Sequence, residues 1–173
     1  MYNHWSDDQK KAMECITLIT SSLNINYPIK CIEHTDNEVL KWLDMFAGID
    51  WMINKKNIIN GIAVRVQWMP FLREPFNTFT IRFERHTGTK TEFEKRIDQI
   101  KNGDLYPKYT LQAYFVENTK TLLSVGLIKT IDLYDFIEKY PKLVYENCSD
   151  NSFKYVKWNE IKNNNVDIAI YEN

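Results

Sequence analysis

The amino-acid sequence predicts a protein of the α/β or α+β class, with a mixed central sheet flanked by helices. Two observations carry this prediction: several segments alternate apolar and polar residues, and capped segments of helical periodicity lie between them. The 173 residues, 44% of them hydrophobic, are enough for one domain with a sizeable core. We therefore expect a single domain over residues 1–173, with a core over residues 37–116, a preceding helix over residues 6–22 and an extension over residues 117–173.

The first part of the chain is expected to be helical. Ser6 and Gln9 form a capping-box pair at the head of residues 6–22, where apolar residues recur on one face. Asp36 is expected to cap a second helix over residues 37–46, and Gly48 follows its end. The apolar residues of this second helix recur at helical spacing: Val39, Leu40, Leu43 and Phe46.

Strand patterns follow. Residues 49–53 and 58–68 are apolar or alternating, are joined by a short polar turn, and precede a third alternating run over residues 78–85. We expect these three strands to form an antiparallel meander. Thr91 and Glu94 form a capping box for a helix that ends at Gly103, and a fourth strand over residues 109–116 returns parallel to a neighbour.

The rest of the chain is expected to continue the same class of fold. Residues 122–129 form an apolar run that predicts a strand, and Thr130 is expected to cap a helix over residues 131–140 that is stopped by a proline. Two later segments, residues 153–158 and 166–171, are expected to be short peripheral strands.

Composition narrows the functional class. The chain contains no run of 18 apolar residues and begins with an acidic segment, so we expect neither a membrane span nor a signal peptide. Three widely spaced cysteines favour reduced thiols in a cytoplasmic protein. The net charge of −1 hides an asymmetry, because residues 55–108 hold eleven Lys and Arg against six Asp and Glu. A phosphate-binding face would have such a basic excess.

Polar residues stand out in the central strands. Arg65 and Gln67 fall on one face of a strand, where polar side chains are costly unless they are paired. An ion pair of Arg65 with Asp50 or Glu92 would satisfy that requirement and be purely structural. Glu92 is also explained by its place in the first turn of a helix, where a negative charge is stabilised by the helix dipole. Gln112, on the fourth strand, is a further candidate member of the same cluster.

The order helix, three strands, helix, strand over residues 37–116, together with Asp50, resembles the PD-(D/E)xK nuclease superfamily, which includes many restriction enzymes, Holliday-junction resolvases and repair nucleases. The resemblance implies a restriction-endonuclease-like core. It also implies that Asp50 and an acid one strand on bind Mg²⁺, which activates water for attack on a phosphodiester. Arg65-Val66-Gln67 stands where that superfamily has Glu-x-Lys or Asp-x-Lys. Gln is found in place of the Lys in some restriction enzymes, but a guanidinium cannot ligate a cation.

Two hypotheses follow from the resemblance. In the first, the second acid has moved to the helix after the third strand, and the protein is a magnesium-dependent DNA endonuclease. Asp50 and Glu92 would then bind the metal ion with help from Gln67, and Lys95 would serve the attacking water. The expected phosphate contacts are four basic residues: Arg65, Arg82, Arg85 and Lys90.

In the second hypothesis, catalysis is lost and the basic patch binds a phosphate backbone or a protein partner. Such a protein would be an inactive nuclease-fold interaction protein of a phage or mobile element that binds a host defence complex. DNA is preferred over RNA only through the resemblance. The residues after Phe115 are numerous enough to supply a dimer surface.

Overall fold

The computed structural model describes residues 14–32, 35–70, 76–84, 88–146 and 152–173. Its strands are β1 (Ile29–Cys31), β2 (Trp51–Lys55), β3 (Ile58–Met69), β4 (Thr78–Arg82), β5 (Tyr109–Val116), β6 (Thr121–Lys129), β7 (Tyr145–Glu146), β8 (Phe153–Lys157) and β9 (Ile168–Glu172). Its helices are a segment over residues 14–22, α2 (Glu38–Trp42), the π-helical turn η1 (Leu43–Ala47), α3 (Glu92–Asn102), α4 (Thr130–Lys139), the 3₁₀ turn η2 (Pro141–Leu143) and α5 (Trp158–Asn163).

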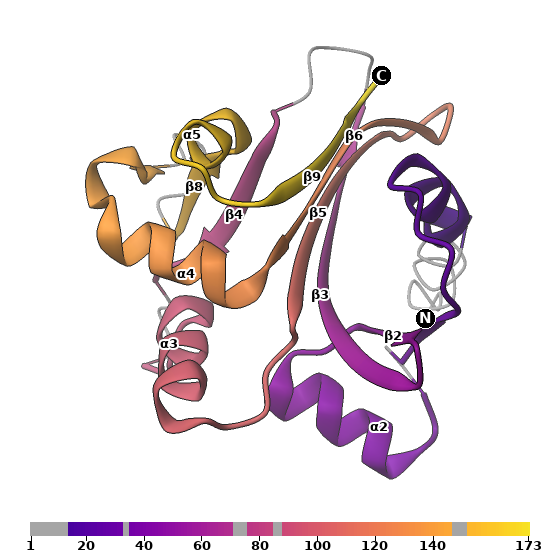
Figure 1. Cartoon of the computed structure of the whole chain (residues 1–173), viewed down its shortest axis with the longest axis horizontal. Helices are drawn as coiled ribbons and strands as arrows, with labels where there is room; N and C mark the ends of the chain where they lie inside the picture. Colours follow the sequence, from indigo (N-terminus) through magenta and orange to yellow (C-terminus); the bar gives the residue numbers. More distant parts are fainter. Residues whose placement is uncertain (1–13, 33–34, 71–75, 85–87, 147–151) are drawn as a thin grey trace.

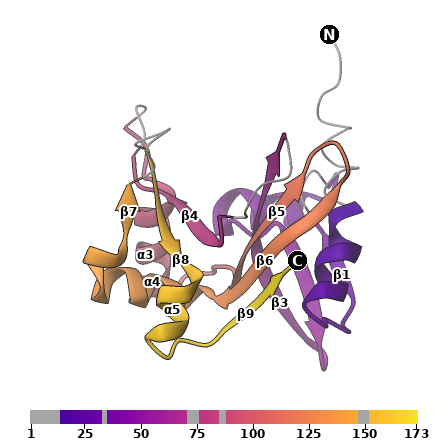
Figure 2. The same ribbon diagram turned by 90° about the horizontal axis from the view of Figure 1, so that it is seen from above.

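Six strands form one mixed sheet in the order β1-β2-β3-β5-β6-β9, and three form a second sheet in the order β4-β8-β7. Figure 2 shows the second sheet with α3, α4 and α5 on one side of the large sheet, and the N-terminal helix on the other. The predicted class, a mixed sheet with flanking helices, is therefore confirmed. The return of the chain through α3 makes β5 parallel to β3, as expected, and brings Gln112 opposite Arg65.

The expected three-strand meander is wrong in its third member. β2 and β3 pair antiparallel, but β4 pairs with β8 and is not part of the large sheet. Both edges of β3 are already occupied, one by β2 and the other by β5. β4 packs onto a face of that sheet, where Thr78 Oγ1 lies 2.8 Å from Tyr114 Oη and Thr80 Oγ1 donates to Gln112 Oε1 at 3.0 Å.

Each face of the large sheet has its own apolar core. The N-terminal helix contributes Cys15 and Ile19 to a cluster with Trp51, Ile62 and Phe115. On the opposite face, the two aromatic residues Phe79 and Trp158 and the apolar side of α4 form the larger cluster. Among the described residues, no helix is both long and apolar enough to cross a bilayer.

Two helix caps differ by one residue from their predicted positions. Asn37, rather than Asp36, caps α2 by accepting a hydrogen bond from the Leu40 backbone N–H at 3.2 Å. Thr130 is the first residue of α4, and its hydroxyl lies 2.9 Å from that of Thr110. The predicted capping box at the head of α3 and the glycine at its end are both confirmed, and Gly103 has a left-handed φ of 72°. Residues 6–13 of the expected N-terminal helix lie outside the described residues.

The apolar residues of the second helix divide between two faces. Leu40 and Leu43 pack against a small buried cluster that includes Ile32 and Ile49. Val39 and Phe46, expected on that same face, are exposed instead. The reason is that the helix is only partly covered, and its chain continues through the wider π-helical turn η1.

We predict that Gly126→Ala lowers the free energy of unfolding by about 1–3 kcal/mol, because it overpacks the larger core. A Cβ at this position of β6 would lie 2.6 Å from Cε2 of the fully buried Trp158. Urea denaturation of Gly126→Ala in the native chain and in a Trp158→Leu background measures the effect. The loss should shrink in the second background, where the indole is gone. Equal losses in both backgrounds would contradict the proposed clash.

Candidate functional site

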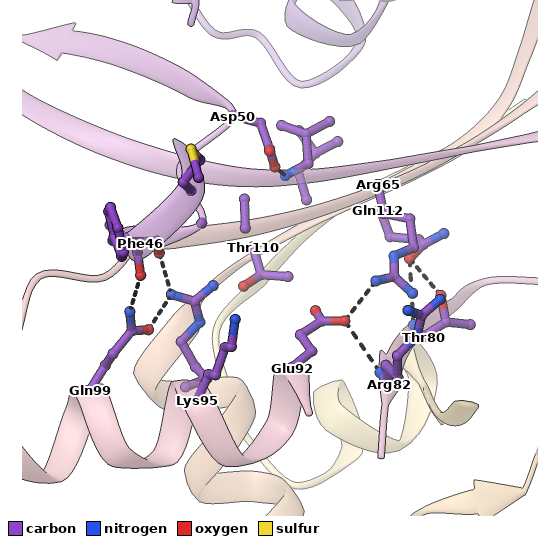
Figure 3. Close-up of a pocket in the computed structure, with 17 residues that line it drawn as sticks. Phe46, Asp50, Arg65, Thr80, Arg82, Glu92, Lys95, Gln99, Thr110 and Gln112 are labelled. Atoms are coloured by element: carbon purple, nitrogen blue, oxygen red, sulfur yellow. Dashed lines mark hydrogen bonds and ion pairs between the residues drawn. The ribbon is translucent and has the colours of Figure 1, made fainter. Parts of the chain in front are cut away.

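A cavity of about 360 Å³ lies between α3, the end of η1 and the strands β3, β4 and β5. Figure 3 shows Glu92, Lys95 and Gln99 projecting from α3 toward Asp50, which precedes β2, and toward the strands that carry Arg65 and Gln112. The polar and charged residues that line the cavity are Asp50, Arg65, Thr80, Arg82, Glu92, Lys95, Arg96, Gln99, Thr110 and Gln112.

The fold thus brings together most of the residues that the sequence singled out. Asp50, Arg65, Arg82, Glu92 and Lys95 come from different elements and line one cavity. Two other candidates among the described residues do not join them. Gln67 shares a face of β3 with Arg65 but lies outside the lining, and Lys90 forms an exposed ion pair with Asp98. Arg85, like its neighbour His86, lies outside the described residues.

The central polar contact of the cavity is an ion pair between Arg65 and Glu92. Arg65 Nη2 donates to Glu92 Oε2 at 2.7 Å, and the backbone N–H of Arg82 donates to the same oxygen at 3.2 Å. Glu92 is in the first turn of α3, where its negative charge is also stabilised by the helix dipole. One carboxylate therefore joins β3, β4 and α3. Of the two ion pairs that the sequence offered for Arg65, with Asp50 or with Glu92, the structure forms the one with Glu92.

Asp50 stabilises the junction of β2 and β3. Its carboxylate accepts a hydrogen bond from the Val64 N–H, and its backbone N–H donates to the Ile62 carbonyl at 3.0 Å. Its own carbonyl accepts from the Ile32 N–H at 2.9 Å. Asp50 therefore extends the β2–β3 ladder while its side chain lies at the edge of the cavity.

The donor set of the cavity does not fit a magnesium site. The Glu92 oxygen closest to β3 is bound by a guanidinium, whose positive charge repels a cation. Nowhere in the described part of the chain do three His, Cys, Asp or Glu side chains gather as metal ligands do. The magnesium ion and the catalytic roles of Asp50, Gln67, Glu92 and Lys95 remain predictions of the resemblance.

Phe153 contacts both cavity arginines. The guanidinium carbon of Arg82 lies 4.6 Å from the centroid of the Phe153 ring, and that of Arg65 lies 5.1 Å from it. A guanidinium on an aromatic face is held in place while its N–H edges stay available for anions. No sequence pattern predicted this contact, because Phe153 is in β8, far along the chain and within the expected peripheral tail.

Arg96 is a structural residue, not part of a solvated helix face. Its side chain is only 7% exposed and donates from Nη1 to the Ala47 carbonyl and to Gln99 Oε1, both at 2.8 Å. Gln99 Nε2 in turn donates to the Phe46 carbonyl at 2.8 Å. Gly48 makes the approach possible: its φ is +64°, and a Cβ there would lie 2.9 Å from Arg96 Nη2. Two side chains of α3 thus fix the end of η1 against the cavity.

Three buried polar side chains complete the surroundings of the cavity. Gln112 is 1% exposed, and because its Oε1 accepts from Thr80, its Nε2 points elsewhere and has no hydrogen-bond partner among the described residues. Burial raises the pKa of Tyr134, and the nearby Glu92 carboxylate adds to this effect, so the phenol stays protonated at neutral pH. Burial also raises the pKa of Tyr114, to about 12.

Comparison of the chain with protein-family models, with curated proteins and with solved structures found no match. The geometry and charge of the cavity are therefore the evidence for its function. Within it, cationic side chains outnumber acidic ones: Arg65, Arg82, Lys95 and Arg96 against Asp50 and Glu92.

We predict that Arg96→Met lowers the free energy of unfolding by about 1.5–3 kcal/mol, because it removes charge-assisted hydrogen bonds between α3 and η1. Lys95→Met is the matched control: the neighbouring side chain is exposed, and its replacement should change stability by at most about 0.5 kcal/mol. Urea denaturation of both variants measures the difference. Equal losses in the two variants would contradict the structural role of Arg96.

Proposed function

We propose that this protein binds nucleic acid, with a backbone phosphate in the cavity beside α3, and that it does so without hydrolysing the phosphodiester. One observation carries the proposal: Arg65, Arg82 and Lys95 reach a single cavity from β3, β4 and α3. Cationic side chains that converge from separate elements are typical of phosphate recognition, and Arg presents a planar set of donors to phosphate oxygens.

The contacts of the two arginines support this role. Glu92 and Phe153 hold Arg65 in place, and Phe153 also holds Arg82, so these side chains lose little further freedom when an anion binds. Lys95 is exposed on the next turn of α3 and adds a mobile positive charge. Residues 55–108, the segment that contains β3, β4 and α3, carry a basic excess of the same sign.

The ion pair is also the reason for proposing binding rather than cleavage. Arg65 occupies the position where the PD-(D/E)xK superfamily has its second acid. It also binds the carboxylate of Glu92, the residue that would replace that acid in the endonuclease hypothesis. DNA remains the first choice of ligand through the resemblance, and RNA is the alternative. An interaction protein of a phage or mobile element that binds a host defence complex is the second hypothesis. Among the described residues, no contact in the cavity favours it over nucleic acid.

Salt dependence of binding tests the phosphate contact. We predict that Lys95→Gln lowers the magnitude of the slope of log K against log salt concentration by about one, because one phosphate contact is lost. Lys90→Gln is the matched control, since this exposed lysine lies outside the cavity and pairs with Asp98; its slope should equal that of the native chain. Fluorescence anisotropy with labelled DNA and RNA at several salt concentrations measures both slopes.

The same labelled DNA and RNA probes also decide between binding and cleavage. Each probe is incubated with the native chain or with Asp50→Asn in the presence of Mg²⁺, Mn²⁺ or EDTA. Intact probe in every condition supports the proposal. Metal-dependent cleavage that is lost in Asp50→Asn would replace it with the endonuclease hypothesis. No binding to any probe would overturn it and favour a protein partner.

A further inference from the structure

An exposed apolar surface lies beside the cavity. Four large side chains of α2 and η1 are each between 64% and 70% exposed, and we call this set the α2 platform: Val39, Trp42, Met45 and Phe46. Their spacing of three, three and one residues places them on the exposed side of the helix, away from the partly buried Leu40 and Leu43. Gathered apolar exposure of this kind marks an interaction site.

The platform is continuous with the phosphate site. Phe46 and Met45 are themselves part of the lining of the cavity that Arg65 and Lys95 reach. The rings of Trp42 and Phe46 lie 5.3 Å apart and are tilted by 56°, so the aromatic surface extends outward from the cavity. Figure 3 shows Phe46 at the end of the cavity next to Gln99.

The hydrogen bonds from α3 keep the aromatic surface at this position. Gln99 donates to the carbonyl of Phe46 itself, and Arg96 donates to that of Ala47, the next residue. The backbone that carries Phe46 is therefore tied to the same helix that carries Lys95. The backbone of η1 and the helix that carries Lys95 are therefore held together when a ligand binds.

We infer that the α2 platform stacks an unpaired base of a single-stranded nucleic acid while a neighbouring phosphate occupies the cavity. This inference rests on the proposed function and adds the class of nucleic acid. A nucleotide unit supplies an anion and a flat aromatic face side by side, which complements a cationic cavity bordered by aromatic rings. In a duplex the base faces are already stacked on one another, so a duplex offers the cavity its phosphates but offers the platform nothing.

The experiment compares one single-stranded oligonucleotide with the duplex of the same sequence. Affinities are measured for the native chain, Trp42→Ala, Phe46→Ala and, as matched control, Ile59→Ala, an equally exposed apolar side chain of β3 that belongs neither to the platform nor to the cavity lining. Loss of one stacked base corresponds to about 1–3 kcal/mol, so each aromatic variant should bind the single strand about 5- to 150-fold more weakly. Duplex affinity should change less than about twofold, and Ile59→Ala should behave like the native chain in both arms.

A second substitution separates stacking from folding. Trp42→Phe keeps an aromatic ring and should restore most of the single-strand affinity, whereas a collapsed helix would not be rescued. All these side chains are exposed, so circular dichroism melts of the variants should match that of the native chain. A loss of affinity in Trp42→Ala that Trp42→Phe fails to restore would overturn the stacking role.

The outcomes also separate this inference from the proposed function. Equal binding of single strand and duplex, unchanged in Trp42→Ala and Phe46→Ala but sensitive to Lys95→Gln, would overturn the platform and leave phosphate binding intact. No binding of either oligonucleotide would overturn both. A protein partner that binds the native chain and is lost in Trp42→Ala, with no oligonucleotide bound, would likewise overturn the base-stacking inference.

Discussion

The ion pair between Arg65 and Glu92 is the contact on which the site depends. It joins the central strand β3 to the first turn of α3, and through the Arg82 backbone N–H it also ties β4 to the same carboxylate. It therefore connects the large sheet, the second sheet and a covering helix through β3, β4 and α3, the three elements labelled in Figure 1. Because a cation and an anion neutralise each other there, the remaining arginine and lysine charges set the sign of the cavity.

The opposite end of the cavity depends on the same helix. Arg96 and Gln99 bind the last carbonyls of η1, where a helix C-terminus carries partial negative charge that a buried cation stabilises. α3 therefore carries Lys95 on its exposed side and holds the backbone of η1 with Arg96 and Gln99. The proposed phosphate and base contacts thus both depend on how α3 packs against the sheet and η1.

The fold class, the parallel return of β5 and the α3 capping box were predictable because each depends on local periodicity or spacing. The pairing of β4 was not predictable, because its alternating pattern is compatible with either sheet. β4 belongs to the second sheet because β2 and β5 already occupy both edges of β3. The gathering of Asp50, Arg65, Arg82 and Glu92 followed from element order. The burial of Arg96 and the contact of Phe153 with two arginines did not, because both depend on residues about fifty or more positions away.

Side-chain NMR of the arginines tests the central claim most directly. The Nε–Hε resonances of Arg65 and Arg82, assigned through Arg65→Lys and Arg82→Lys, are followed while single-stranded DNA or RNA is titrated into the protein. Binding in the cavity predicts saturable shifts of both resonances together with that of the Lys95 side chain. Shifts confined to residues outside the cavity, at concentrations where the nucleic acid is bound, would contradict it.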